Sequence, residues 1–130
     1  TYFNNRHMAV RELEVEAGVD HSECLKALMA IRDALDVLSG KWKLQIIIAI
    51  SSGQSKFKDI ERQIPKLTPR MLSKELKNLE EHQLIKRLVY DTVPVTIEYK
   101  LTPHAKTLDK VILELRNWGM LHRKKILSKS

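Results

Sequence analysis

The stretch IPKLTPRMLSKELKNL, residues 64–79, decides the fold. Pro65 ends one helical segment, and Thr68-Pro69 begins the next, because threonine is a good N-cap and proline is tolerated at the first helical position. Leucines then recur at helical spacing, at Leu72, Leu76 and Leu79. This spacing predicts a helix over Pro69–His82 whose leucine stripe faces a core.

The residues on either side of this helix complete a larger motif. Upstream, Phe57, Ile60 and Ile64 predict a short helix over Lys56–Ile64, and a tight turn joins the two helices. Residues 56–82 are therefore expected to form a helix-turn-helix. Downstream the hydrophobic period changes to two, which predicts strands over Leu84–Tyr90 and Val95–Leu101 around an Asp91–Pro94 turn. A hairpin over residues 84–101, directly after the second helix, is a wing.

Further helices are expected before this motif. An amphipathic helix over Ser22–Leu38 is predicted by an apolar stripe at Cys24, Leu28, Ile31, Leu35 and Leu38. Lys41–Ser51 is apolar nearly all round, which is typical of a helix in the middle of a core. A strand over Ile46–Ile50 is the alternative, but the bracketing Gly40 and Gly53 favour helix. The acidic segment Val10–Ala17 predicts a short helix that ends at Gly18.

The last predicted helix spans residues 103–127 and begins at a second Thr-Pro pair, Thr102-Pro103. It is too long and too apolar for a small domain to cover, so we expect it to pack against its own copy across a two-fold axis. The expected dimer interface consists of Leu108, Val111, Ile112, Leu115, Trp118 and His122. The predicted fold is mainly α with a small β-hairpin wing, with an N-terminal extension over residues 1–21 and a winged helix-turn-helix domain with flanking dimerisation helices over residues 22–130.

Composition and charge restrict the possible partners. The chain has 130 residues, enough for one domain with its own core, and a formal net charge of +7. Residues 1–40 carry a net charge of −3, whereas residues 41–90 carry +6. Such a basic middle indicates a polyanion partner, with a general solubility charge as the alternative. We expect no membrane span and no signal peptide, and a single cysteine fits a reducing cytoplasm.

Specific residues add a family resemblance to this pattern. They are Ser39-Gly40-Lys41-Trp42, Lys56-Phe57 with Ile60, Leu67-Thr68-Pro69-Arg70-Met71-Leu72, Leu76-Lys77-Asn78-Leu79-Glu80, Leu84-Ile85-Lys86-Arg87, and Val95 to Leu101 followed by Thr102. Together they resemble the HxlR-type family of bacterial regulators over roughly residues 34–118. The resemblance implies a MarR-like winged-helix dimer that binds promoter DNA, often as a repressor and sometimes as an activator.

The chain departs from the family pattern at three places. Gln83 and Ala105 stand where relatives usually have glycine, and neither change removes a group that would read bases. Many relatives also carry a cysteine nearer to the Gly-Lys-Trp than Cys24, which lies 16 positions before Gly40. A buried, packing cysteine is therefore the favoured interpretation of Cys24 over an oxidant sensor.

The candidate DNA-binding residues follow from the helix-turn-helix. If the leucine stripe faces inward, the opposite face of the second helix presents cations and a hydroxyl to the major groove, and its N-terminal turn lies deepest. Lysines at the starts of the apolar helix and of the first helix of the motif are further phosphate candidates, and the wing is expected to contribute phosphate or sugar contacts only. The candidates are Lys56, Lys58, Thr68, Pro69, Arg70, Ser73, Lys74, Lys77, Arg87, Thr92 and Thr96, with Lys41, Lys43 and Lys86 as weaker ones.

Other chemistry finds no support in the sequence. The five histidines show no metal-ligand spacing, and we see no nucleophile with a base, no Gly-rich phosphate loop and no paired carboxylates. We therefore expect no metal, no cofactor and no enzymatic activity. The expected function is a sequence-specific regulator that binds an inverted-repeat operator in double-stranded DNA as a homodimer. A winged helix used only for protein contacts is the alternative, and RNA binding is a weaker one.

Overall fold

The computed structural model describes residues 21–128, and its chain divides into two compact units, residues 1–39 and 40–130. The described part of the first unit is helix α2 (His21–Leu38), where the sequence predicts a helix. The short helix predicted over Val10–Ala17 lies outside the described residues. Because α2 belongs to the first unit, the chain divides after Ser39, and the domain boundary at residue 21 stays a prediction.

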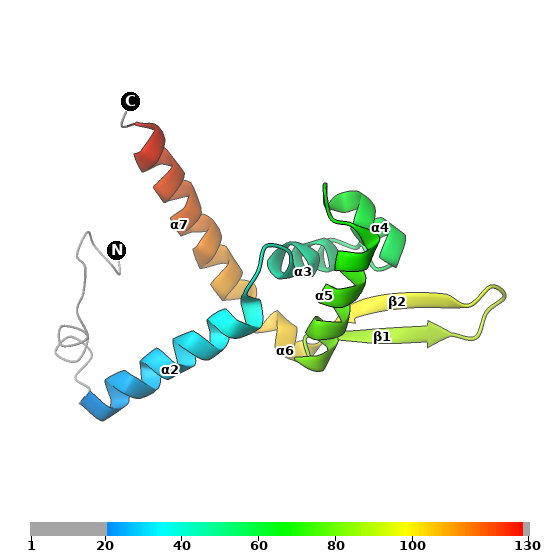
Figure 1. Ribbon diagram of the computed structural model, residues 1–130, viewed down its shortest axis with the longest axis horizontal. Helices are drawn as coiled ribbons and strands as arrows, with labels where there is room; N and C mark the ends of the chain where they lie inside the picture. Colours follow the sequence, from blue (N-terminus) through cyan, green and yellow to red (C-terminus); the bar gives the residue numbers. More distant parts are fainter. Residues whose placement is uncertain (1–20, 129–130) are drawn as a thin grey trace. The chain divides into compact units, whose positions relative to one another are not determined.

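The second unit is mainly helical and carries one antiparallel hairpin (Figure 1). Its elements follow the predicted order: α3 (Lys43–Ser51), α4 (Phe57–Gln63), α5 (Pro69–Glu81), β1 (Ile85–Tyr90), β2 (Thr96–Leu101), α6 (Pro103–Lys106) and α7 (Asp109–Leu127). The segment Ile46–Ile50 is helical, so the strand alternative is wrong. The glycines that bracket it, Gly40 and Gly53, have φ angles of +93° and +107°, a region that other residues rarely adopt.

The core of the second unit lies between α3, α4, α5 and the base of the hairpin. The leucine stripe of α5 is buried as predicted, with Leu72 and Leu79 completely inaccessible. The other buried apolar residues are Ile46, Ile47, Ala49, Ile50, Ile60, Ile64, Leu67, Leu76, Leu84, Ile85 and Ala105. Each of these elements therefore gives one face to a shared interior, which fixes the face that α5 leaves exposed.

The hairpin is attached to the helical core by hydrogen bonds as well as by packing. Its register pairs Ile85 with Leu101 at the base and Tyr90 with Thr96 near the tip. The N–H of Tyr99 donates to the carbonyl of Ser55 over 2.7 Å, and the Ser55 hydroxyl donates to the Glu98 carboxylate over 3.0 Å. The wing is thus tied to the segment that leads into α4, while its tip extends away from the helices (Figure 1).

The single helix predicted over residues 103–127 is interrupted. Thr102 caps the first part as expected, since its hydroxyl accepts from the N–H of Ala105. The N–H groups of Thr107 and Leu108 then bond three residues back instead of four, and the Thr107 hydroxyl donates to the carbonyl of His104. This tighter turn ends α6, and α7 begins anew with the bond from Ile112 to Leu108. Such competition by a threonine side chain is not visible in a hydrophobic pattern.

Gln83 shows why glycine is usual at its position. Its φ angle is +61°, in the left-handed region where a side chain is costly and glycine is not. The turn places the carbonyl of Gln83 where the hydroxyl of Thr102 donates to it over 2.7 Å. The backbone of this chain therefore takes a left-handed turn at a residue that carries a side chain.

Candidate nucleic-acid interface

Helix α5 presents a polar face opposite its buried leucine stripe. Arg70, Ser73, Lys74 and Lys77 are all exposed, as the sequence predicts. Farther along the same helix, Glu80 and Glu81 are also exposed, so the C-terminal turn carries negative charge. Attraction to a phosphate backbone is therefore strongest along the first two to three turns of α5.

The N-terminus of α5 offers fewer backbone donors than its sequence position suggests. Pro69 has no N–H, and the N–H of Met71 donates to the Thr68 hydroxyl oxygen over 3.2 Å. The N–H of Leu72 donates to the carbonyl of Thr68, so Arg70 supplies the one backbone N–H of this turn with no acceptor among the described residues. Thr68 accepts at its oxygen, and its hydroxyl hydrogen remains able to donate to a phosphate.

The lysines of α3 and α4 differ in their surroundings. Lys56 is the exposed N-cap residue of α4, and Lys58 extends into solvent at 3.9 Å from Glu61, which is a weak surface pair. Lys43 is almost entirely buried, and its Nζ lies 2.7 Å from Oε1 of Glu75 on α5. Lys43 is therefore excluded as a phosphate contact, because its charge is already paired inside the protein.

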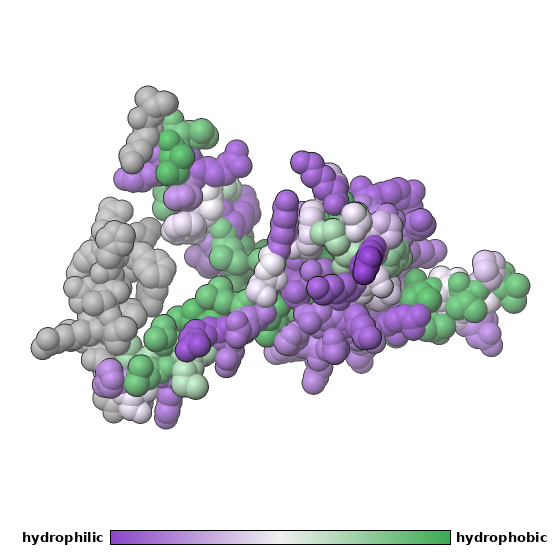
Figure 2. All heavy atoms as spheres, viewed as in Figure 1, coloured by the Kyte–Doolittle hydropathy of each residue, from purple (hydrophilic) through white to green (hydrophobic). Residues whose placement is uncertain are grey.

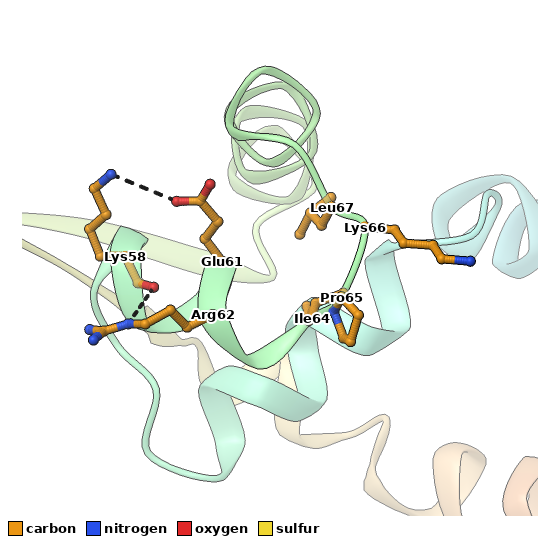
Figure 3. Close-up of a pocket in the computed structure, with 7 residues that line it drawn as sticks. All are labelled: Lys58, Glu61, Arg62, Ile64, Pro65, Lys66 and Leu67. Atoms are coloured by element: carbon orange, nitrogen blue, oxygen red, sulfur yellow. Dashed lines mark hydrogen bonds and ion pairs between the residues drawn. The ribbon is translucent and has the colours of Figure 1, made fainter.

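The turn of the helix-turn-helix adds a cation that sequence reasoning missed. Lys66 is exposed and has a φ angle of +70°. It borders an open depression lined by Lys58, Glu61, Arg62, Ile64, Pro65, Lys66 and Leu67 (Figure 3). In this view Lys58 and Arg62 extend to one side and Lys66 to the other. Enclosed apolar pockets are the usual sites for small molecules, and this open, charged surface lacks that character.

The base of the wing also carries basic side chains. Lys86 and Arg87 are exposed, and alternation along β1 places them on opposite faces of the hairpin. Within residues 21–128 neither forms an ion pair with Glu80 or Glu81. The register sets Lys86 directly opposite Lys100, and like charges in this relation repel each other unless an anion lies near them. Sequence reasoning missed Lys100 as a candidate phosphate contact, because only the register of the two strands places it beside Lys86.

The tip of the wing is apolar and has no positive charge. Val93, Pro94 and Val95 are exposed, and Figure 2 shows hydrophobic side chains gathered at this end of the hairpin. The Thr92 hydroxyl lies 2.9 Å from the Thr96 hydroxyl and donates to the carbonyl of Pro94 over 2.7 Å. These two predicted contact residues are thus engaged with each other and with the turn.

Helix α7 exposes the residues predicted for a dimer interface. It has no buried residue, and Val111, Leu115 and Trp118 are each close to half exposed. The rings of Trp118 and His122 stack with centroids 4.8 Å apart. Leu108 and Ile112 are partly covered. An apolar stripe of this length facing solvent is typical of a surface that binds another protein chain.

Three remaining expectations concern Cys24, metals and membranes. Cys24 is buried, which agrees with the packing interpretation of this residue. Residues 21–128 contain no cluster of three or more histidine, cysteine, aspartate or glutamate side chains that could hold a metal ion. In the same residues, none of the helices combines the length and apolar character needed to cross a bilayer.

Comparisons with known proteins agree with this geometry. A family model described as HxlR-like helix-turn-helix matches residues 37–126. The uncharacterized HTH-type transcriptional regulator YdeP of Bacillus subtilis is 35% identical over 109 residues, covering 84% of this chain and 85% of YdeP. An uncharacterized HTH-type transcriptional regulator of Methanothermobacter thermautotrophicus is 37% identical over 95 residues, covering 73% of this chain and 72% of that protein.

Solved structures give the same result. The redox regulator HypR in its reduced form aligns with a TM-score of 0.71 at 34% identity, covering 76% of this chain and 98% of HypR. A transcriptional regulator described as of the MarR family, from Enterococcus faecalis, aligns with a TM-score of 0.69 at 28% identity, covering 78% of this chain and 92% of that one. The predicted winged helix-turn-helix fold and the family resemblance are confirmed.

Proposed function

The chain belongs to the HxlR-like helix-turn-helix family, and we propose that it regulates transcription by binding an inverted-repeat operator in double-stranded DNA as a homodimer. As a member of a family of helix-turn-helix transcriptional regulators, it is not an enzyme. The observation that carries the proposal is the exposed basic face of α5, directly opposite the buried stripe of Leu72, Leu76 and Leu79. We place the protein in the cytoplasm, where its DNA target lies.

In the proposed mechanism α5 enters the major groove with its N-terminal turn leading. Arg70 and Lys74 donate to guanine edges, and Lys77 contacts phosphate. The Thr68 hydroxyl and the N–H of Arg70 hold a phosphate at the helix start, where the helix dipole is positive. The carboxylate of Glu81 repels phosphate, which keeps the C-terminal end of α5 away from the DNA backbone.

A homodimer gives the operator its symmetry. Two α5 helices related by a two-fold axis would occupy successive major grooves on one side of the duplex, which are about 34–36 Å apart. The proposed seam is the apolar stripe that runs from Leu108, the N-cap residue of α7, along that helix to His122. The proposed contacts are made largely by lysine and arginine side chains to phosphates, so affinity should fall steeply with salt.

The experiment is operator selection followed by fluorescence anisotropy. A random duplex library is enriched on the protein, and binding of the selected duplex is compared with that of its scrambled version at two salt concentrations. We expect an inverted repeat, and we expect Arg70→Ala and Lys74→Ala each to weaken binding to it by about tenfold or more, the size of one lost base contact.

A matched control removes a cation elsewhere. Lys110 is exposed on α7, outside the proposed interface, so Lys110→Ala should leave the preference for the selected duplex unchanged. Equal losses in all three variants would mean that net charge alone drives binding. If the unmodified protein binds no duplex at low salt, the proposal fails and a winged helix used for protein contacts takes its place.

A further inference from the structure

The ion pair between Lys43 and Glu75 joins the first turn of α3 to the middle of α5. The two charged atoms are 2.7 Å apart, and only 11% and 17% of the two side chains are exposed. The pairs Lys58–Glu61 and Arg62–Asp59, by contrast, each lie within α4 and reach into solvent. Lys43–Glu75 is therefore a contact between helices, formed on the helix that carries the proposed base-reading residues.

Stability gives no sufficient reason for this pair. Its neighbours along the two helices, such as Ile46, Leu72 and Leu76, are buried and apolar. A partly buried ion pair in such surroundings loses much of its Coulomb attraction to desolvation, and apolar residues of similar volume are often as stable or more so. Lys43 also lies in the first turn of α3, where a positive charge opposes the helix dipole. The pair must provide something that hydrophobic packing lacks.

What the ion pair provides is a fixed orientation of α5 about its own axis. Leucine side chains hold α5 against the core, but they tolerate small rotations and shifts better than a short, charged hydrogen bond does. Side chains on a helix reach about 5–6 Å from its axis, so a rotation of about 30° displaces their ends by roughly 3 Å. A displacement of that size breaks a hydrogen bond to a base edge, which tolerates only a few tenths of an ångström.

We propose that Lys43 and Glu75 are positioning residues that set the rotation of α5 about its own axis, and thereby the sequence discrimination of the protein. The proposal rests on the proposed function. Lys43 holds Glu75 on a flank of α5 beside the leucine stripe, while Arg70 and Lys74 project from the face opposite that stripe into the groove. Phosphate contacts are less demanding in geometry, so the pair affects the choice of sequence more than the affinity for DNA in general.

The test separates positioning from stability. In the double variant Lys43→Met/Glu75→Leu both charges disappear together, so the net charge stays constant and the site becomes apolar. We expect its thermal midpoint to equal or exceed that of the unmodified protein. We also expect the ratio of its Kd for the scrambled duplex to its Kd for the selected duplex to fall by about tenfold, with binding of the scrambled duplex unchanged.

Two further variants keep the test decisive if the double variant does not fold. Glu75→Gln preserves shape but removes the charge, and it should lower the discrimination ratio. The reversed pair, Lys43→Glu/Glu75→Lys, restores an ion pair and should recover most of that ratio. A folded variant without the pair that discriminates as well as the unmodified protein would overturn the inference. Failure of the unmodified protein to discriminate at all would instead refute the proposed function.

Discussion

Helices α5 and α7 both carry apolar side chains at helical spacing, but only α5 buries them in the structure. In α5 the apolar side chains at helical spacing are buried, whereas in α7 none of the nineteen residues is buried. Helix α2 resembles α7, since Cys24 is its one buried residue. Periodicity therefore shows that a helix has an inward face, but it does not show whether the covering surface comes from the same chain.

The difference also separates a contribution to stability that is independent of protein concentration from one that depends on it. The core around α3, α4 and α5 is complete within one chain, so its contribution should not depend on protein concentration. In the proposed homodimer the apolar stripe of α7 would be stabilised by its partner, so that contribution should depend on protein concentration. The predictions below are arranged from the largest expected effect to the smallest.

The largest effect is expected in the self-contained core. Leu76→Ala removes a buried side chain from the centre of α5 and should lower the free energy of unfolding by about 3 kcal/mol, through lost burial and the cavity that remains. Urea unfolding followed by circular dichroism measures this loss. The loss should be the same at low and at high protein concentration, and a strong dependence would contradict the view that one chain completes this core.

The second effect concerns the proposed seam. Leu115→Ala combined with Trp118→Ala should raise the dimer dissociation constant about 100-fold, because large apolar side chains at the centre of an interface contribute most of its affinity. Sedimentation velocity at several concentrations measures it. Leu113 is a matched control, since its 48% exposure is close to the 49% of Leu115 but it lies on another side of α7. A larger effect from Leu113→Ala would place the seam on that other side.

The third effect concerns the tip of the wing, an exposed apolar surface that we do not expect to bind a protein chain. The tip of the wing, like α7, exposes apolar residues, yet we expect it to face DNA and not a protein chain. Thr96→Arg adds a cation near the tip and should raise DNA affinity several-fold at low salt, with a salt dependence steeper by about one counterion. Anisotropy over a salt series measures both quantities. An unchanged slope would indicate that the wing does not approach the duplex.

The smallest effect is a gain in stability at the end of α5. Gln83→Gly removes the cost of a side chain at a φ angle of +61° and should stabilise the protein by about 0.5 kcal/mol, after the greater freedom of glycine in the unfolded chain is subtracted. The midpoint of urea unfolding reports the change. Gln83→Ala, which keeps a Cβ, should give no such gain, and an equal gain from alanine would rule out relief of the backbone as the cause.

The exposure of most candidate DNA-binding residues was predictable from the sequence, and the exceptions have physical reasons. Arg70, Lys74 and Lys77 are exposed as predicted, because the buried leucines of α5 fix which residues face outward, and their contacts with DNA stay a proposal. Lys43 was misplaced because a charged residue at a helix start usually faces solvent, and its partner Glu75 is far away in sequence. Lys100 was missed because its neighbour across the hairpin is set by the register of the strands.

The sequence by itself determined the order of the elements, the N-caps at Thr68 and Thr102, and the helix face that leucine buries. These are local properties, governed by capping, by backbone conformation and by the spacing of apolar residues. The tertiary structure decided the Lys43–Glu75 pair and the register that sets Lys86 against Lys100. Each of these depends on which groups compete for a contact once distant segments meet, and no local pattern contains that information.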